Sequence, residues 1–285
     1  MTLLEADHIS FSYPDSSRQT LLDLSFSISS GELIGLIGPS GSGKTTLVKL
    51  LNGLLRPTGG HIRLHGEDTG RRRFRMVELR KRVGLVFQYP ELQLFKKTVW
   101  EDVAFGPSNL GASREEARSA AREALSLVGL GPEFEIRSPL DLSGGEMRLA
   151  AIAGVLAMHP ELLILDEPAA GLDPAAKTRM LDLLKTIRTQ TETSVLLVSH
   201  SMEDIADYTD RVLVLSEGRL LMDALPSRVF QQIKMMQEIG TGVPQITAVA
   251  EELRRCGIPI SSLPTTVSDA AACFSELLGE ELHAQ

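Results

Sequence analysis

The stretch LIGLIGPSGSGKT, Leu33–Thr45, decides the fold. Its first half is a short apolar run that ends in glycine, which predicts a buried strand followed by a tight turn. Its second half matches G-x-x-x-x-G-K-[ST], in which glycines let backbone N–H groups surround phosphates while the lysine reaches the outer phosphate oxygens. We therefore expect a phosphate-binding segment, called the lysine loop below, that comprises Gly38, Pro39, Ser40, Gly41, Ser42, Gly43, Lys44, Thr45 and Thr46.

Further apolar runs of the same kind follow along the chain: RVGLVFQ, LLILDEP, SVLLVSH and RVLVLSEG. Short apolar strands separated by helical stretches are typical of a largely parallel sheet that is buried on both faces. In such sheets ligands bind beyond the carboxyl ends of the strands. Gln88, Asp166, Glu167 and His200 all come at those ends, so we expect them near the lysine loop.

Each of these polar side chains suits one part of phosphate chemistry. The Thr45 hydroxyl and the Asp166 carboxylate can hold Mg²⁺, directly or through water. Glu167 can accept a proton from water that attacks a γ-phosphate, which favours hydrolysis over phosphoryl transfer. The Gln88 amide can offer oxygen to Mg²⁺ and NH₂ to water, and His200 can hydrogen-bond the γ-phosphate. The lysine loop by itself is shared by kinases, GTPases and motor ATPases.

A second segment with the character of a phosphate seat is DLSGGEMRLA, Asp141–Ala150, which has no lysine. Ser143 and Glu146 have the spacing of a capping box, so the segment can simply start a helix. A helix start does not require Gly144 and Gly145, however, and glycines there permit close approach of a ligand. Both interpretations stay open from these residues alone.

The remaining regions predict an α/β protein with additions. LLEADHISFSY, TLLDLSFSIS and HIRLHG read as strands of an antiparallel layer, and residues of about 90–160 read as a helical subdomain with a capping box from Ser113 to Glu116. After residue 225 the composition changes, and 226–285 read as a small C-terminal domain of short helices around a hinge rich in proline and glycine. The basic run Gly70–Arg82 is predicted to be a solvated helix face rather than a nucleic-acid or lipid patch.

Composition limits the classes of function. The chain has 285 residues, 43% of them hydrophobic, and a formal net charge of -8, which argues against bulk binding of nucleic acid. The sequence starts without the pattern of a signal peptide, and its apolar runs are shorter than the roughly 18 residues that a membrane-spanning helix needs. Cys256 and Cys273 do not form a close pair and are expected to be reduced.

Taken in order, the motifs resemble the ATPase subunits of ABC transporters over residues 1–225. The matching segments are the lysine loop, Gln88, LSGGE, LLILDEP, AGLD and His200. The resemblance implies that Tyr13 stacks on adenine and that Asp173 lies near the nucleotide. A finer resemblance is to ATPases of energy-coupling factor (ECF) transporters, which include cobalt and nickel importers, and it rests on VFQYPELQLFKKTVWEDVAFGPSNLG with its second glutamine Gln93, on GGEMR, and on AIAGVLAMHPELLILDEPAAGLDP.

This resemblance implies a function and a set of partners. ABC ATPases dimerise head to tail, so that the signature segment, Ser143, Gly144, Gly145 and Glu146, caps the ATP held by the lysine loop of a second, identical or related chain. Glu146 departs from the glutamine usual in the family. The expected protein is a peripheral ATPase on the cytoplasmic face of the cell membrane, whose C-terminal domain takes part in dimerisation.

The expected enzyme hydrolyses ATP with Mg²⁺ to drive uptake of a vitamin or a transition-metal ion. Uptake would pass through an integral coupling subunit and a substrate-binding membrane subunit, with no nucleic acid as partner. Alternatives are an ATPase of a non-ECF ABC transporter and a soluble ABC protein that acts on nucleic acid or ribosomes. The single lysine loop and the lack of a heptad run disfavour the soluble alternative.

Overall fold

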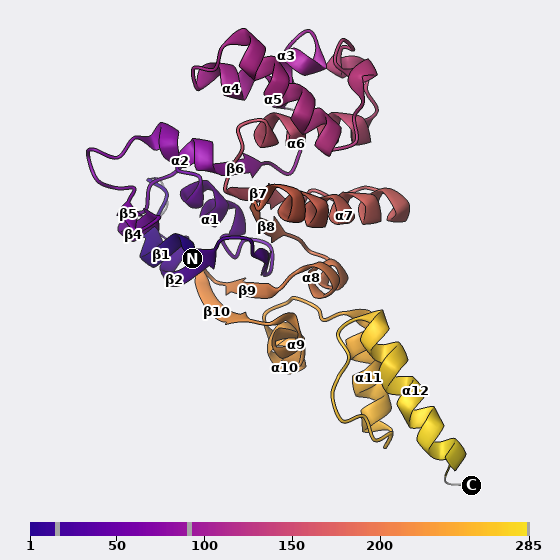
Figure 1. Ribbon diagram of the computed structural model, residues 1–285. Helices are drawn as coiled ribbons and strands as arrows, with labels where there is room; N and C mark the ends of the chain where they lie inside the picture. Colours follow the sequence, from indigo (N-terminus) through magenta and orange to yellow (C-terminus); the bar gives the residue numbers. More distant parts are fainter. Residues whose placement is uncertain (15–17, 90–92, 284–285) are drawn as a thin grey trace.

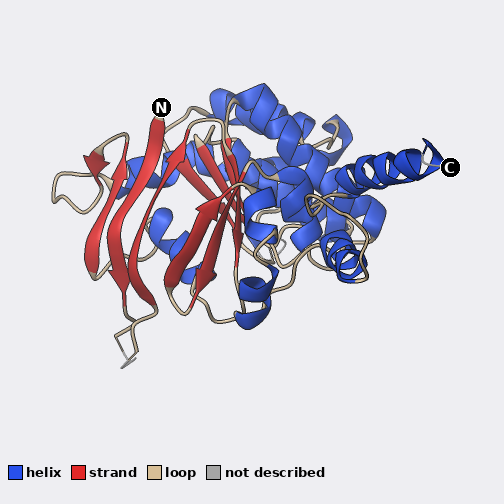
Figure 2. Ribbon diagram, turned by 90° about the horizontal axis from the view of Figure 1, so that it is seen from below, coloured by secondary structure: helices blue, strands red, loops and turns tan. Residues whose placement is uncertain are grey.

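Two stacked β-sheets form the centre of the molecule, with helix α1 (Lys44–Leu51) packed between them (Figure 1). The computed structural model describes residues 1–14, 18–89 and 93–283, with side chains up to residue 277. Helices cover the far side of the larger sheet, and the C-terminal helices extend from one end of the body (Figure 2). The architecture is therefore the α/β type that the sequence predicts.

The larger sheet carries the predicted parallel strands. Its order is β10-β9-β3-β8-β7-β6, in which β9, β3, β8, β7 and β6 pair in parallel and only β10 pairs antiparallel. The bounds are Arg219–Ala224 for β10, Arg211–Ser216 for β9, Leu33–Ile37 for β3, Ser194–Val198 for β8, Leu162–Asp166 for β7 and Val83–Val86 for β6. Because parallel strands end at one edge, the polar residues that follow them are brought to that edge.

The smaller sheet is antiparallel, as predicted. Its order is β2-β1-β4-β5. The bounds are Leu21–Ser29 for β2, Thr2–Phe11 for β1, Gly59–Leu64 for β4 and Glu67–Asp68 for β5. Alternate residues of β2 are buried, since one face packs on α1 and the larger sheet while the other meets solvent.

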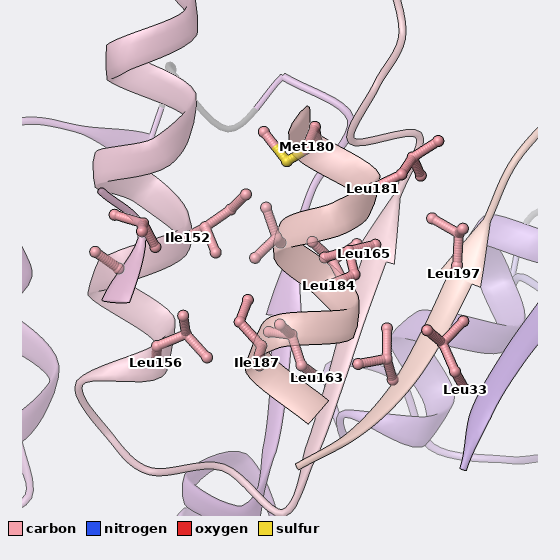
Figure 3. Packing of buried hydrophobic residues seen from close by; sticks show 14 of the residues in the cluster. Leu33, Ile152, Leu156, Leu163, Leu165, Met180, Leu181, Leu184, Ile187 and Leu197 are labelled. Carbon is pink, nitrogen blue, oxygen red and sulfur yellow. The ribbon is translucent and has the colours of Figure 1, made fainter. Parts of the chain in front are cut away.

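The two faces of the larger sheet belong to two apolar cores. Ile34 and Leu36 of β3 face α1 and the smaller sheet, whereas Leu33 and Ile37 face the outer helices. Figure 3 shows this outer core, in which β7 packs against α6 (Gly144–Leu156) and α7 (Pro174–Thr191). The contacting residues are Ile152, Leu156, Leu163, Leu165, Met180, Leu181, Leu184 and Ile187.

The helical region between β6 and β7 confirms the expected helices. It contains α3 (Val99–Val103), α4 (Phe105–Asn109), α5 (Arg114–Leu127) and α6. Ser113 and Glu116 form the predicted capping box at the start of α5, where each side chain accepts from the other residue's backbone N–H. The basic run is helical only in α2 (Met76–Arg82), so the predicted helix face covers half of it.

The C-terminal part consists of α9 (Pro226–Phe230), α10 (Ile233–Glu238), α11 (Gln245–Arg255) and α12 (Val267–His283). Val229 and Phe230 join the outer core of the main body. A separate small cluster forms farther on, from Ile233, Ala250, Ile260 and Leu263. The helix α12 has 17 residues and is longer than the short helices expected. The division into domains at residue 225 stays a prediction.

Two smaller expectations concern the cysteines and the membrane. Cys256 and Cys273 are both free. Among the residues that the structure describes, no helix is long and apolar enough to cross a membrane.

Candidate functional site

The lysine loop connects β3 to α1, and its shape requires glycine at two points. Gly38 has a φ of 152°, and a Cβ added to it would lie 2.0 Å from the backbone oxygen of Leu215 on β9. Gly43 has a φ of 108°, and its added Cβ would lie 2.5 Å from Leu21 Cδ2. Other side chains would therefore displace the neighbouring strands, so the loop is tightly set by the chain's own packing.

Lys44 lies folded back over this loop. Its Nζ donates to the carbonyl oxygens of Gly38 at 2.7 Å and Pro39 at 3.0 Å, and the residue is only 7% exposed. Burial lowers the pKa of Lys44, although the carboxylates of Glu167 and Asp166 oppose this. The buried Lys44 ammonium bonds here only to neutral carbonyl oxygens. Anionic phosphate oxygens form stronger hydrogen bonds with an ammonium, so they can replace these carbonyl oxygens when phosphate binds.

Two hydroxyls of the loop reach other parts of the fold. Thr45 Oγ1 donates to Asp166 Oδ2 at 3.2 Å, which joins the start of α1 to the end of β7. Thr46 Oγ1 lies 3.2 Å from the hydroxyl of Tyr13, which follows β1. The Tyr13 ring packs edge-on against Phe11, with a centroid distance of 4.9 Å, and is 39% exposed. The predicted aromatic residue therefore lies beside the lysine loop with solvent access.

Glu167 and His200 face each other across neighbouring strand ends. His200 Nε2 lies 3.4 Å from Glu167 Oε1, and this oxygen is buried without a hydrogen bond. Glu167 has a φ of 55°, which is unusual for a residue with a side chain. Its N–H donates to the Val198 oxygen of β8 at 3.0 Å, which helps to hold this conformation.

The electrostatics of this group follow from burial. Burial raises the pKa of Glu167 to about 7, with the nearby Asp166 charge adding to the rise and Lys44 opposing it. Burial also raises the pKa of Asp166 and lowers that of His200. A carboxylate that titrates near neutral pH, beside a histidine and a lysine, is typical of a site for proton transfer.

Gln88 lies at the same sheet edge but farther along. It follows β6, the last strand of the sheet, and is exposed. In the described residues it makes no hydrogen bond with the lysine loop or Asp166. The structure thus brings together the lysine loop, Tyr13, Asp166, Glu167 and His200, and it leaves Gln88 at the border of this group.

The signature segment starts α6 and forms the second capping box that its spacing predicts. Ser143 N–H donates to Glu146 Oε2 at 2.7 Å, and Glu146 N–H donates to Ser143 Oγ at 3.3 Å. The hydrogen bonds from Ser143 lower the pKa of the Glu146 carboxyl. Gly144 and Gly145 are exposed, and a Cβ added to either would meet no atom within 4 Å. Nothing in the chain's own packing demands glycine there.

Asp173 likewise works as a helix cap. Its Oδ1 accepts from the Ala176 N–H at 2.9 Å at the start of α7. No hydrogen bond or ion pair within the described residues joins Asp173 or the signature segment to the lysine loop. These predicted site residues therefore lie outside the cluster that a single chain assembles.

Arg148 is a residue to which the sequence assigned no role. It lies on α6 only 8% exposed, and its Nη1 donates to the carbonyl oxygens of Pro168 and Ala170 at 2.9 Å each. The helix of the signature segment is thereby tied to the segment that follows Glu167. The available signal was an arginine in the helix GGEMRLAAIAGVL, whose other residues are apolar after Glu146.

A groove opens on the side of the molecule next to Gln88. It has a volume of about 520 Å³ and lies between α2 and β6 on one side and α3, α4 and α6 on the other. Its walls are mainly apolar, with Phe95 and Phe105 packed edge to face at a centroid distance of 5.0 Å. Phe95 is 62% exposed, so the groove presents apolar surface to solvent.

The site combines a phosphate loop after the central strand β3 with an Asp-Glu pair at the end of β7, two strands away in the same sheet. Together with a second glycine-bearing helix start, these features define a P-loop ATPase of the ABC type. A family model described as "ABC transporter" matches residues 21–170. The energy-coupling factor transporter ATP-binding protein EcfA2 of Caldanaerobacter subterraneus subsp. tengcongensis is 45% identical over 270 residues, which cover 94% of each chain. The chain belongs to this family, the ATP-binding subunits of ECF-type ABC transporters, and is an ATPase.

Solved structures agree with this assignment. The structure of cbiO1 from Clostridium perfringens, part of the ABC transporter complex cbiONQ, has a TM-score of 0.75 and 32% identity, and covers 88% of this chain and 99% of that one. A dimeric ATP-binding cassette in a post-hydrolysis state, bound to ADP and Pi, has a TM-score of 0.69 and 25% identity, and covers 79% of this chain and 99% of that one.

Proposed function

We propose that this chain binds MgATP between its lysine loop and the signature segment of a second ATPase chain, and that hydrolysis drives uptake through membrane partners. The observation that carries the proposal is the convergence of Lys44, Thr45, Asp166, Glu167 and His200 at one sheet edge. These residues come from the lysine loop, the end of β7 and the end of β8, and together they supply cation, metal ligand, base and hydrogen-bond donor.

The residues at this edge fit Mg²⁺. The Thr45 hydroxyl and the Asp166 carboxylate lie 3.2 Å apart, and hydroxyl and carboxylate oxygens are the hard ligands that Mg²⁺ prefers. Gln88 would add an amide oxygen from β6. When bound, Mg²⁺ neutralises charge on the phosphate oxygens. Water and phosphate would fill its remaining positions, since Mg²⁺ usually keeps several waters.

The chain's own groups then divide the chemistry. The Lys44 ammonium binds the β- and γ-phosphate oxygens in place of the Gly38 and Pro39 carbonyls. Glu167 accepts a proton from the attacking water, for which a pKa of about 7 is well matched to neutral pH. His200, 3.4 Å from Glu167, donates a hydrogen bond to the γ-phosphate and so helps to position this phosphate relative to the Glu167 carboxylate. Tyr13 would stack on the adenine.

The signature segment is proposed to act on the partner's ATP. Gly144 and Gly145 leave their surroundings open, so phosphate oxygens of another chain's nucleotide can approach the backbone and the start of α6. Ser143 and Asp173 would border the same seam. The known dimer with ADP and Pi supports a dimeric arrangement for this fold, and the second chain can be identical or related.

The groove beside Gln88 is proposed to receive a cytoplasmic segment of an integral coupling subunit. Such docking would place the chain at the cytoplasmic face of the membrane, with a separate membrane subunit binding the cargo, a vitamin or a transition-metal ion. The support is the exposed apolar wall at Phe95 and Phe105 and the proximity of the groove to β6, which leads to Gln88.

Co-purification from membranes tests this proposal. The tagged chain, co-expressed with its transport partners, is expected to bring down integral subunits and to hydrolyse ATP. Phe95→Asp should abolish recovery of these subunits while ATP binding persists, since the side chain is 62% exposed and its loss leaves the core intact. Leu221→Asp is a matched control on β10, 43% exposed and outside the groove. Equal recovery with all three chains would contradict the groove assignment.

A further inference from the structure

The basic run Gly70–Arg82 has a charge opposite to that of the rest of the chain. Its sequence GRRRFRMVELRKR contains seven basic and one acidic side chain, a formal +6 in a chain whose net charge is -8. The proposed ATP site uses none of these residues. A positive segment of this size on an acidic protein calls for an anionic surface as its counterpart.

The run is an ordered surface because apolar residues anchor it. Phe74 and Met76 pack against the apolar core between the two sheets, and Leu79 is 1% exposed within that core. Its start is fixed by Asp68, whose Oδ1 accepts from the Gly70 N–H at 2.8 Å. The Phe74 N–H donates to the Arg71 oxygen at 2.9 Å, which closes a turn. The basic side chains therefore stand on a fixed backbone.

Most of these side chains have no partner in the described part of the chain. Arg82 pairs with Glu161 at 3.1 Å, and Arg80 donates to the Gly53 oxygen. The others are exposed and take part in no ion pair within the described residues, namely Arg71, Arg72, Arg73, Arg75 and Lys81. Elsewhere, by contrast, Arg63 pairs with two carboxylates, those of Glu5 and Asp7.

The position of the run relates it to the groove. Val77, Arg80 and Lys81 of α2 form part of the groove wall. In Figure 1 the loop between β5 and α2 forms the outer edge of the molecule on the side where α4 lies. A membrane subunit that docks in the groove would bring this edge toward the bilayer surface.

We propose that the basic run binds anionic phospholipid headgroups when the ATPase is docked on its membrane partner. The proposal rests on the function proposed above for the groove. Phospholipid is favoured because four exposed cations outside the groove wall, Arg71, Arg72, Arg73 and Arg75, form a basic cluster of the size that binds anionic lipid surfaces.

Vesicle flotation of the purified chain tests the proposal directly. The wild type is expected to bind vesicles that contain phosphatidylglycerol and not vesicles of phosphatidylcholine alone, with binding that weakens as salt rises. The triple change Arg71→Gln, Arg72→Gln and Arg73→Gln should weaken binding about 10²-fold, since each basic side chain near an anionic surface contributes roughly a factor of five. Arg219→Gln, Arg228→Gln and Lys234→Gln together are the matched control, with the same charge change at exposed positions.

Other outcomes separate the lipid from competing partners. Equal binding by the two triple variants would overturn the proposal, as would wild-type binding to phosphatidylcholine vesicles that is as tight as binding to vesicles with phosphatidylglycerol. Loss of the membrane subunits from the detergent-solubilised complex of the first variant would assign the run to a protein contact instead. The first variant should hydrolyse ATP in that complex as fast as the wild type does. Absence of ATP hydrolysis in the wild-type complex would contradict the proposed function, whereas vesicle binding tests the lipid proposal alone.

Discussion

The two glycine-bearing helix starts of this chain use glycine for different reasons. In the lysine loop, Gly38 and Gly43 have positive φ, and added Cβ atoms would collide with β9 or with Leu21. In the signature segment, Gly144 and Gly145 lack positive φ, and added Cβ atoms would meet open space. The first pair is required by the chain's own packing, while the second pair is not.

This difference shows which seat is complete within one chain. The lysine loop already has Lys44, Asp166 and Glu167 around it, together with a tight wall of neighbouring strands. The signature segment has its helix cap and free space in front of it. Packing within the chain explains the glycines of the lysine loop. The glycines of the signature segment are explained only by another molecule that approaches them closely.

The largest expected effect comes from breaking one seat in each of two chains. Lys44→Ala removes the phosphate-binding cation, and Gly145→Asp adds bulk and negative charge at the signature segment. Each homodimer should be nearly inactive. In a mixed dimer one site has both faults and the other has neither, so random mixing should recover roughly a quarter of wild-type ATPase activity if a two-fold axis pairs the seats.

The measurement is the ATPase activity of a random mixture of the two variants, with a different tag on each variant to show that mixed dimers form. Recovery above the sum of the two homodimers supports seats that pair across the dimer. If mixed dimers form but activity stays at the homodimer level, the result would contradict pairing across the dimer, provided that one intact site can hydrolyse ATP alone.

The next effect isolates chemistry at the lysine-loop seat. Glu167→Gln should keep ATP binding and lower turnover by about 10²- to 10⁴-fold, because a general base is lost. Its ATP-bound dimers should accumulate, which size exclusion with and without ATP would reveal. Asp182→Asn, an exposed acid on α7, is a control that should retain turnover. Near-normal hydrolysis by the glutamine variant would remove Glu167 from the mechanism.

A moderate effect on stability should distinguish the two glycine pairs. Gly38→Ala places a Cβ 2.0 Å from the Leu215 oxygen and is expected to lower the free energy of unfolding by about 2–4 kcal/mol. Gly145→Ala meets no atom within 4 Å and should change it by less than about 0.5 kcal/mol. Urea unfolding of both variants measures the change in the free energy of unfolding. Equal decreases in the two variants would contradict the difference between Gly38 and Gly145.

The smallest effect concerns the carboxylate at the signature segment. The Glu146 pKa is lowered by hydrogen bonds with Ser143, so its contribution to stability is present above the ordinary value of 4.5 and is lost as pH falls through the folded value. Glu146→Gln keeps the capping geometry and loses the charge near a helix start, which should cost a few tenths of a kcal/mol at pH 7. Unfolding curves should converge with wild type in acid. A gap that widens in acid would refute this sign.

The sequence predicts most of what local patterns can encode. The lysine loop, both capping boxes and the strand ends at Asp166 and His200 follow from glycine spacing, cap spacing and apolar runs, and the structure confirms their placement. These features depend on residues that are close together in the sequence, so the sequence alone is sufficient to predict them. The domain division and the roles of the site residues stay predictions.

Features that depend on distant contacts were not predictable. Arg148 can be buried because the carbonyl groups of Pro168 and Ala170, in the segment that follows β7, accept its hydrogen bonds. The raised pKa of Glu167 comes from burial by surrounding elements, which no local motif reports. In the basic run, charge pattern alone suggested one helix, whereas the turn that starts at Gly70 is set by Asp68.

The open space in front of Gly144 and Gly145 has a consequence for how mutations would be read. A mutational scan that reports only folding or abundance should find both positions permissive, since the isolated chain loses no contact there. A scan that selects for transport should find the same positions intolerant. Disagreement between the two maps would therefore mark surfaces whose neighbours belong to another molecule, and it would do so without any structure of the assembly.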